Sequence, residues 1–108
     1  PYASAKWGII GLMKTLAMEL GPYGIRVNAI CPGAVAGDRM DRVIANEAHA
    51  RSISEDALRQ GYADCVSMKT FVDATDIADM ALYLASDQAR MVSGMAMAVD
   101  GHTEKITL

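Results

Sequence analysis

The sequence predicts an α/β fold with parallel strands. A helical pattern over Tyr2–Leu20 is followed by a tight turn and by a β-branched run at Ile25–Cys31. The same order returns near the end, where a helical pattern over Asp73–Ser86 precedes an apolar run at Met95–Val99. Helix followed by strand is the second half of a βαβ unit, the unit that builds parallel sheets. The strand that such a unit needs before Tyr2–Leu20 is absent from this sequence.

The first helix is predicted by a wide apolar stripe. The stripe consists of Ile9, Met13, Leu16 and Leu20, with Ile10 and Ala17 beside it. Gly21 and Pro22 follow the last apolar residue, which is the usual end of a helix. A helix apolar over so much of its circumference needs cover on more than one side. A sheet would supply one layer, and a partner subunit could supply another.

The middle of the chain is more polar and predicts an inserted helical lid at residues 36–70. One weak helical pattern begins near Asp38, and a second begins near Ser52 or Ser54. Ser52-x-x-Glu55 resembles a capping box. The helix after the lid is clearer, because Asp73 can cap it, Asp76 lies in its first turn, and apolar residues follow at helical spacing.

Composition narrows the functional classes. The hydrophobic fraction of 52% favours a packed core over disorder, and the net charge of −3 argues against a nucleic-acid binder. No apolar run is long enough to cross a bilayer. Cys31 and Cys65 form no metal-ligand pattern, so we expect reduced thiols, no metal site and a cytoplasmic protein. The chain opens at Pro1 rather than Met, which suggests a fragment.

Tyr2 and Lys6 are the strongest candidates for chemistry. Four residues apart on a helix, they share one face. A tyrosine phenol ionises near pH 10, and a nearby ammonium lowers that pKa. A tyrosine tuned in this way can exchange a proton with an alcohol or a carbonyl oxygen. A lone Tyr-x-x-x-Lys is more often an exposed helix pair, so the interpretation depends on the surrounding motifs.

Those motifs resemble the short-chain dehydrogenase/reductase family, in its C-terminal portion. They are Tyr2-Ala3-Ser4-Ala5-Lys6, Gly24-Ile25-Arg26-Val27-Asn28-Ala29-Ile30-Cys31-Pro32-Gly33, Asp76-Ile77-Ala78, Leu84-Ala85-Ser86, Ser93-Gly94 and Val99-Asp100-Gly101, in the family's order and spacing. The resemblance implies the C-terminal part of a doubly wound, parallel-sheet Rossmann fold that binds NAD or NADP. One domain would comprise a catalytic helix, strand and nicotinamide loop at 1–35, the substrate lid at 36–70, and the last helix and strand at 71–108.

The resemblance also assigns residues. Tyr2 matches the general acid/base, and Lys6 matches the lysine that tunes it and holds the nicotinamide ribose. Pro32, Gly33 and Val35 match the loop against the nicotinamide. The implied activity is NAD(P)-dependent interconversion of an alcohol and a ketone by hydride transfer. A homodimer or homotetramer is implied as well, with the protein's own N-terminal nucleotide-binding half as a further partner.

Three departures limit the resemblance. The sequence holds neither the glycine-rich phosphate loop nor the family's catalytic serine, and Gly37 stands where the family often has Thr. A non-catalytic Rossmann-like binding or regulatory module, or an inactive fragment, is the alternative. The choice between NAD and NADP, the substrate and the reaction direction stay open. His102, where the family often has a second Gly, is expected to be a plain surface residue.

Overall fold

The structure, a computed structural model, describes residues 1–103, and of Tyr2 it describes the backbone alone. The elements are α1 (Tyr2–Leu20), the 3₁₀ turn η1 (Gly21–Tyr23), β1 (Ala29–Pro32), α2 (Asp38–Arg51), α3 (Glu55–Asp64), α4 (Ala74–Ala85), the 3₁₀ turn η2 (Asp87–Ala89) and β2 (Ala96–Val99). They form two compact units, of which unit 1 joins residues 1–31 to 79–97 and unit 2 joins residues 32–78 to 98–103. The boundaries between the two units fall within β1, α4 and β2.

The two strands pair in parallel, as the sequence predicts. In unit 1 the amide of Ala29 donates to the carbonyl of Met95 at 2.9 Å, and in unit 2 the amide of Gly33 donates to the carbonyl of Val99 at 3.0 Å. Both partners advance by four residues in the same direction, which is the register of a parallel pair.

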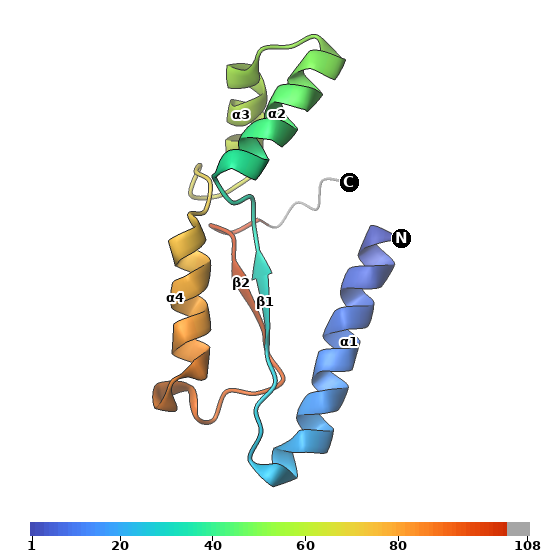
Figure 1. The fold of residues 1–108 in the computed structure, drawn as a ribbon, viewed down its shortest axis with the longest axis vertical. Coiled ribbons are helices and arrows are strands. Elements are labelled where there is room, and N and C mark those ends of the chain that lie inside the picture. Colours follow the sequence, from blue (N-terminus) through green and yellow to red (C-terminus); the bar gives the residue numbers. More distant parts are fainter. Residues whose placement is uncertain (104–108) are drawn as a thin grey trace. The chain divides into compact units, whose positions relative to one another are not determined.

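In unit 1, α1 and the second half of α4 lie on opposite sides of the strands (Figure 1). The stripe of α1 that faces the strands is anchored by Met13, which is buried. The Lys14 ammonium donates to the Gly94 carbonyl at 2.8 Å, and Ala17 packs against Gly94. Elsewhere on the helix several large apolar side chains are exposed, with Trp7 at 68%, Leu12 at 59% and Met18 at 74%. The prediction that α1 needs cover on more than one side agrees with this exposure.

The end of α1 differs from the sequence expectation in its detail. The helix ends at Leu20 as predicted, but Gly21 keeps a right-handed helical conformation and begins η1. The left-handed residue is Gly24, at φ 74°, where the chain reverses toward β1. Glycine adopts this conformation without the steric cost that a Cβ imposes.

The predicted strand Ile25–Cys31 is wrong in its first half, since β1 begins only at Ala29. Before Ala29, side-chain hydrogen bonds connect this segment to the loop that precedes β2. The Asn28 amide donates to the Val92 carbonyl at 2.9 Å and its oxygen accepts from the Met95 amide at 3.1 Å. The Ser93 hydroxyl oxygen accepts from the Val27 amide at 3.1 Å. We call this set the Asn28 clamp; it fixes the loop before β2 and thereby the register of the two strands.

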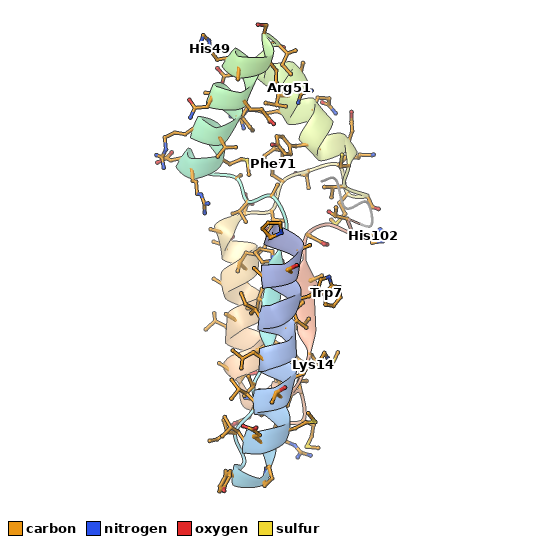
Figure 2. The ribbon with its side chains drawn as sticks, turned by 90° about the vertical axis from the view of Figure 1, so that its right-hand side faces the viewer. Trp7, Lys14, His49, Arg51, Phe71 and His102 are labelled. Atoms are coloured by element: carbon orange, nitrogen blue, oxygen red, sulfur yellow. The ribbon has the colours of Figure 1, made fainter. Side chains whose placement is uncertain are left out.

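Unit 2 contains the lid, and its two helices share a small core. Ile44, Ala48 and Leu58 are buried together, with Met40, Tyr62 and Phe71 packed against them. The Phe71 ring lies between α2 and α3 in Figure 2 and meets the Tyr62 ring edge-on, with centroids 6.3 Å apart. The lid therefore has its own apolar interior.

The capping box predicted at Ser52 is wrong. Ser52 ends α2 in a left-handed conformation, φ 54°, and the residue that caps α3 is Ser54, whose hydroxyl accepts from the Ala57 amide at 3.1 Å. A serine is tolerated as a helix end when its conformation closes the last carbonyls, here those of Ala48 and His49.

The two ends of the lid lie next to each other in unit 2. Val35 and Val72 form a parallel bridge, with the Val72 amide donating to Ala34 and the Ala36 amide donating to Val72. Residues on both sides of the lid are thus held together at its base. α4 follows directly, and the Asp76 carboxylate accepts from the Asp73 amide at 2.9 Å, which stabilises the start of that helix.

Candidate active site

Tyr2 and Lys6 begin α1 in unit 1, one helical turn apart. The turn is closed by the Ala5 amide, which donates to the Pro1 carbonyl at 2.9 Å. Lys6 is exposed, as are the small residues Ala3, Ser4 and Ala5 that precede it. The side chain of Tyr2 lies outside the described residues. The backbone arrangement provides the i, i+4 spacing on which the predicted pair depends.

Pro32 is the last residue of β1, and Gly33 and Val35 lie in the loop that follows it, all three in unit 2. Gly33 lies in close contact with Asp100, because a Cβ added to Gly33 would lie 2.7 Å from the Cβ and 2.9 Å from the Cα of Asp100. Val35 is held by its bridge to Val72. The loop is therefore fixed at both ends, by the last strand and by the residue that follows the lid. No larger residue than glycine fits at position 33 without a backbone shift.

The predicted site residues therefore fall into two groups. Tyr2 and Lys6 belong to unit 1, and Pro32, Gly33 and Val35 belong to unit 2. The first group begins α1, and the second lies at the end of β1 and just after it.

Tyr62 is a titratable side chain of α3 that packs against the lid core. Burial raises the pKa of Tyr62 above its ordinary value, and the hydrogen bond to the Glu47 carboxylate and the charge of that carboxylate raise it further. The phenol donates to Glu47 Oε2 at 3.0 Å. Because this bond joins α3 to α2 beside the lid core, it has a structural role.

Charged residues of α2 lie on a solvated face. Arg39, Asp41 and Arg42 are exposed, and Asp41 accepts a hydrogen bond from Arg59 of α3 at 2.6 Å. His49 is exposed near the end of α2 (Figure 2). An exposed ion pair of this kind contributes little to stability.

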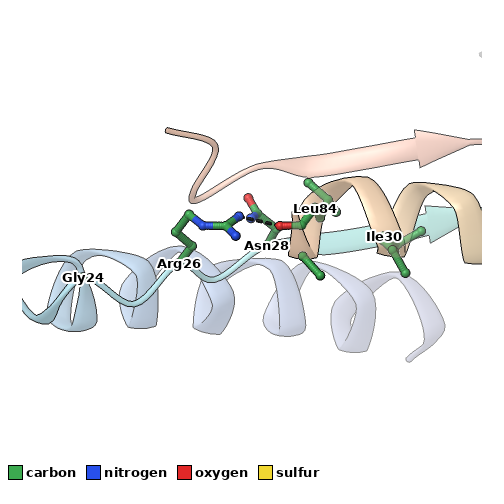
Figure 3. Close-up of a pocket in the computed structure, with 7 residues that line it drawn as sticks. Gly24, Arg26, Asn28, Ile30 and Leu84 are labelled. Atoms are coloured by element: carbon green, nitrogen blue, oxygen red, sulfur yellow. Dashed lines mark hydrogen bonds between the residues drawn. The ribbon is translucent and has the colours of Figure 1, made fainter. Parts of the chain in front are cut away.

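Two residues have roles that the sequence did not reveal. The first is Arg26, whose guanidinium donates to the Leu84 carbonyl in the last turn of α4 (Figure 3) and to the Ser86 carbonyl just after that helix. Carbonyls of the last helical turn lack a partner inside the helix, and a cation there also interacts favourably with the helix dipole. A hollow of about 440 Å³ opens beside it in unit 1, lined by Gly24, Arg26, Asn28, Ile30, Ala81, Leu84 and Ala85. Its polar side chains are already bonded to the backbone, so it offers few groups to a ligand.

The second residue is His102, which is exposed, as expected of a surface histidine, but also contacts the end of the lid. Its Nδ1 lies 2.6 Å from the Ser67 hydroxyl oxygen, at the end of the lid. Its backbone is left-handed, at φ 70°. The one signal in the sequence was the family resemblance, in which glycine often occupies this position.

Within residues 1–103, no three His, Cys, Asp or Glu side chains are grouped so as to hold a metal ion. None of the helices in that range is long and apolar enough to cross a membrane.

A parallel strand pair with helices on both sides, a lid after the first strand and a Tyr-x-x-x-Lys helix define the C-terminal part of a Rossmann-type α/β protein. The sequence matches the family described as "Enoyl-(Acyl carrier protein) reductase" over residues 1–102. The chain belongs to the short-chain dehydrogenase/reductase family.

Individual proteins agree with this assignment. The chain is 37% identical over 101 residues to D-beta-hydroxybutyrate dehydrogenase of Rhizobium meliloti (strain 1021), covering 93% of the chain and 39% of that enzyme. L-sorbose reductase from Gluconobacter frateurii, solved with NADPH and L-sorbose, matches 98% of the chain and 41% of its own length, at 27% identity and TM-score 0.86. A 4-hydroxyisoleucine dehydrogenase solved with NADH and succinate matches 95% of the chain and 37% of its own length, at 32% identity and TM-score 0.75. The chain thus spans about two fifths of the length of these proteins.

Proposed function

We propose that this chain is the part of an NAD(P)-dependent oxidoreductase that exchanges the proton between the protein and an alcohol or ketone substrate. The observation that carries the proposal is the Tyr2–Lys6 spacing at the head of α1, within an ordered set of family motifs. The known dehydrogenases and reductases that the chain resembles support the reaction class.

In this proposal Tyr2 is the general acid and base. During reduction its phenol donates a proton to the carbonyl oxygen, and during oxidation its phenolate accepts the proton of the alcohol. Lys6 assists because a positive charge one turn away favours the phenolate and lowers the phenol pKa. Lys6 is exposed, so its ammonium is accessible to a bound molecule.

The cofactor, NAD or NADP, supplies or accepts the hydride. The chemistry of the donors fits it: the Lys6 ammonium has three N–H donors and no acceptor, which suits ribose hydroxyls. The loop of Pro32, Gly33 and Val35 follows the carboxyl end of β1, where open α/β sheets bind nucleotides. Gly33 donates its amide to Val99, so its contribution to the loop is shape rather than a hydrogen bond to the cofactor. The two structures with bound nucleotide hold NADPH in one case and NADH in the other, so the choice stays open.

The rest of the proposal concerns partners. The protein's own N-terminal nucleotide-binding half would complete the sheet and form one domain with this chain. A second copy of the subunit would cover the exposed apolar residues of α1, among them Leu12 and Met18, in a homodimer or homotetramer. We expect a small-molecule alcohol or ketone as substrate and a cytoplasmic location.

The test uses the full-length protein that contains this chain. Reduction of acetoacetate, 3-oxoacyl thioesters and ketoses is followed by the absorbance of NADH and NADPH, first to find a substrate. Tyr2→Phe should then lower turnover by roughly 10²–10⁴-fold, the range for losing general acid–base catalysis, with nucleotide affinity largely kept. Lys6→Met should weaken nucleotide binding and move the pH dependence of alcohol oxidation to higher pH.

Tyr23→Phe, at a position that is 78% exposed, is the matched control and should behave as wild type. Near-normal turnover by Tyr2→Phe at saturating nucleotide across the pH range would exclude the mechanism. It would favour the alternative of a non-catalytic Rossmann-like module.

A further inference from the structure

The end of the lid, residues 65–70, meets the turn that follows β2, and both belong to unit 2. The Ser67 amide donates to the His102 carbonyl at 2.9 Å, and the Met68 amide donates to the Gly101 carbonyl at 3.1 Å. The Ser67 hydroxyl and His102 Nδ1 add a side-chain bond of 2.6 Å. Three hydrogen bonds thus join two short segments far apart in the sequence.

The turn after β2 is shaped for this contact. Gly101 and His102 are both left-handed, at φ 66° and 70°. At Gly101 an added Cβ would lie 2.8 Å from Val66 Cγ1, so the two segments touch closely. At His102 a left-handed backbone is costly for a residue with a Cβ. The conformation is held by the Asp100 carboxylate, which accepts from the His102 amide at 2.8 Å.

The same turn contacts the loop Pro32–Val35, which the family resemblance places against the nicotinamide. Asp100 packs against Gly33, leaving no room for a Cβ there, and Gly33 is hydrogen-bonded to Val99. The turn Asp100–His102 therefore has the Pro32–Val35 loop on one side and the end of the lid on the other. The loop and the end of the lid are therefore connected through a single short turn.

We infer that His102 and Ser67 are a pair of positioning residues that hold the lid in a fixed geometry relative to the loop Pro32–Val35, and so set the affinity for substrate. This inference rests on the proposed function, since it takes the lid to be the cover of the substrate. The pair acts through the lid and exchanges no proton with the substrate. The bond suits either charge state of the imidazole, because Nδ1 accepts from the hydroxyl when neutral and donates to it when protonated.

The experiment compares substitutions in the full-length protein, without and with added NADH or NADPH. Ser67→Ala and His102→Gly each remove the side-chain bond, and glycine keeps the left-handed backbone. His102→Asn is the conservative variant, because asparagine tolerates this backbone and places an oxygen near the position of Nδ1. His49→Ala removes an exposed histidine of α2 and serves as the control.

Hydrogen exchange of lid peptides within residues 38–64 is read by mass spectrometry. Ser67→Ala and His102→Gly should each speed the exchange by roughly threefold to tenfold, the range for one hydrogen bond. Exchange in the double variant should be no faster than in either single variant. In His102→Asn and His49→Ala the exchange rate should match that of wild type. With acetoacetate as the probe, the KM should rise by a similar factor, with kcat within about twofold and nucleotide affinity unchanged.

Unchanged lid exchange in both Ser67→Ala and His102→Gly would overturn the inference. So would a fall in kcat with KM constant. If the wild-type protein reduces no probe, the proposed function loses its support, whereas the exchange measurement still decides whether the pair holds the lid.

Discussion

Removing the Asn28 clamp should destabilise the protein by an amount that the structure allows one to estimate. Asn28→Ala deletes two hydrogen bonds, of 2.9 Å to the Val92 carbonyl and 3.1 Å to the Met95 amide, from a half-buried side chain. Each such bond contributes about 1 kcal/mol net, so the free energy of unfolding should fall by about 2 kcal/mol. Ser93→Ala, which deletes one exposed bond to the Val27 amide, should cost about half as much.

Both variants are measured in the full-length protein by urea denaturation followed by circular dichroism, with linear extrapolation of the unfolding free energy. Exchange of the Met95 amide adds a local reading and should accelerate in Asn28→Ala more than in Ser93→Ala. A loss under about 0.5 kcal/mol for Asn28→Ala, with Met95 exchange unchanged, would refute the view that these side chains fix the loop before β2.

Two further predictions concern unit 2. Gly33→Ala should lower the free energy of unfolding by about 1–3 kcal/mol, because the new methyl group would lie 2.7 Å from Asp100 Cβ; Gly11→Ala, with nothing within 4 Å of the added Cβ and a helical backbone, should be neutral or stabilising in the same denaturation assay. Because the pKa of Tyr62 is raised in the folded state, the folded protein retains a proton that the unfolded chain releases above about pH 10, so stability should fall as pH rises through that region. Tyr62→Phe should flatten that slope in thermal unfolding between pH 8 and 11, whereas Tyr23→Phe should leave it as in wild type.

The helices could be predicted well because their signals are local. The apolar stripe containing Met13 predicted α1, and the apolar pattern after Asp76 predicted α4. In both cases the helical spacing and the signals for the helix ends lie within a short stretch of sequence. The order of helix and strand was enough to predict the parallel pair.

The errors arose where a residue's partner lies far away in the sequence. Asn28 pairs with residues 64 and 67 positions further on, and β1 begins only after Asn28, although the apolar pattern begins at Ile25. Ser52 and Ser54 both fit a helix start, and only the left-handed backbone at Ser52 separates them. His102 could not be paired with Ser67 from sequence, because the two residues are 35 positions apart, with α4 and β2 between them.

The candidate site was predicted on a different basis. Spacing alone gave Tyr2 and Lys6 a common helix face, and the structure supplies that helix. The roles of Pro32, Gly33 and Val35 came from the family resemblance, and the structure adds a steric reason for glycine at position 33.

The parallel bridge between Val35 and Val72 holds the two ends of the lid next to each other. The apolar interior around Ile44 is built from residues between 40 and 71, within the lid or directly after it. We expect that residues 36–71 could be replaced by a segment of different length or sequence with both junctions kept at the same separation. Under the proposed function, substrate preference in chimeras joined at Val35 and Val72 would follow the inserted segment, while the helix that carries Tyr2 and Lys6 would be unchanged.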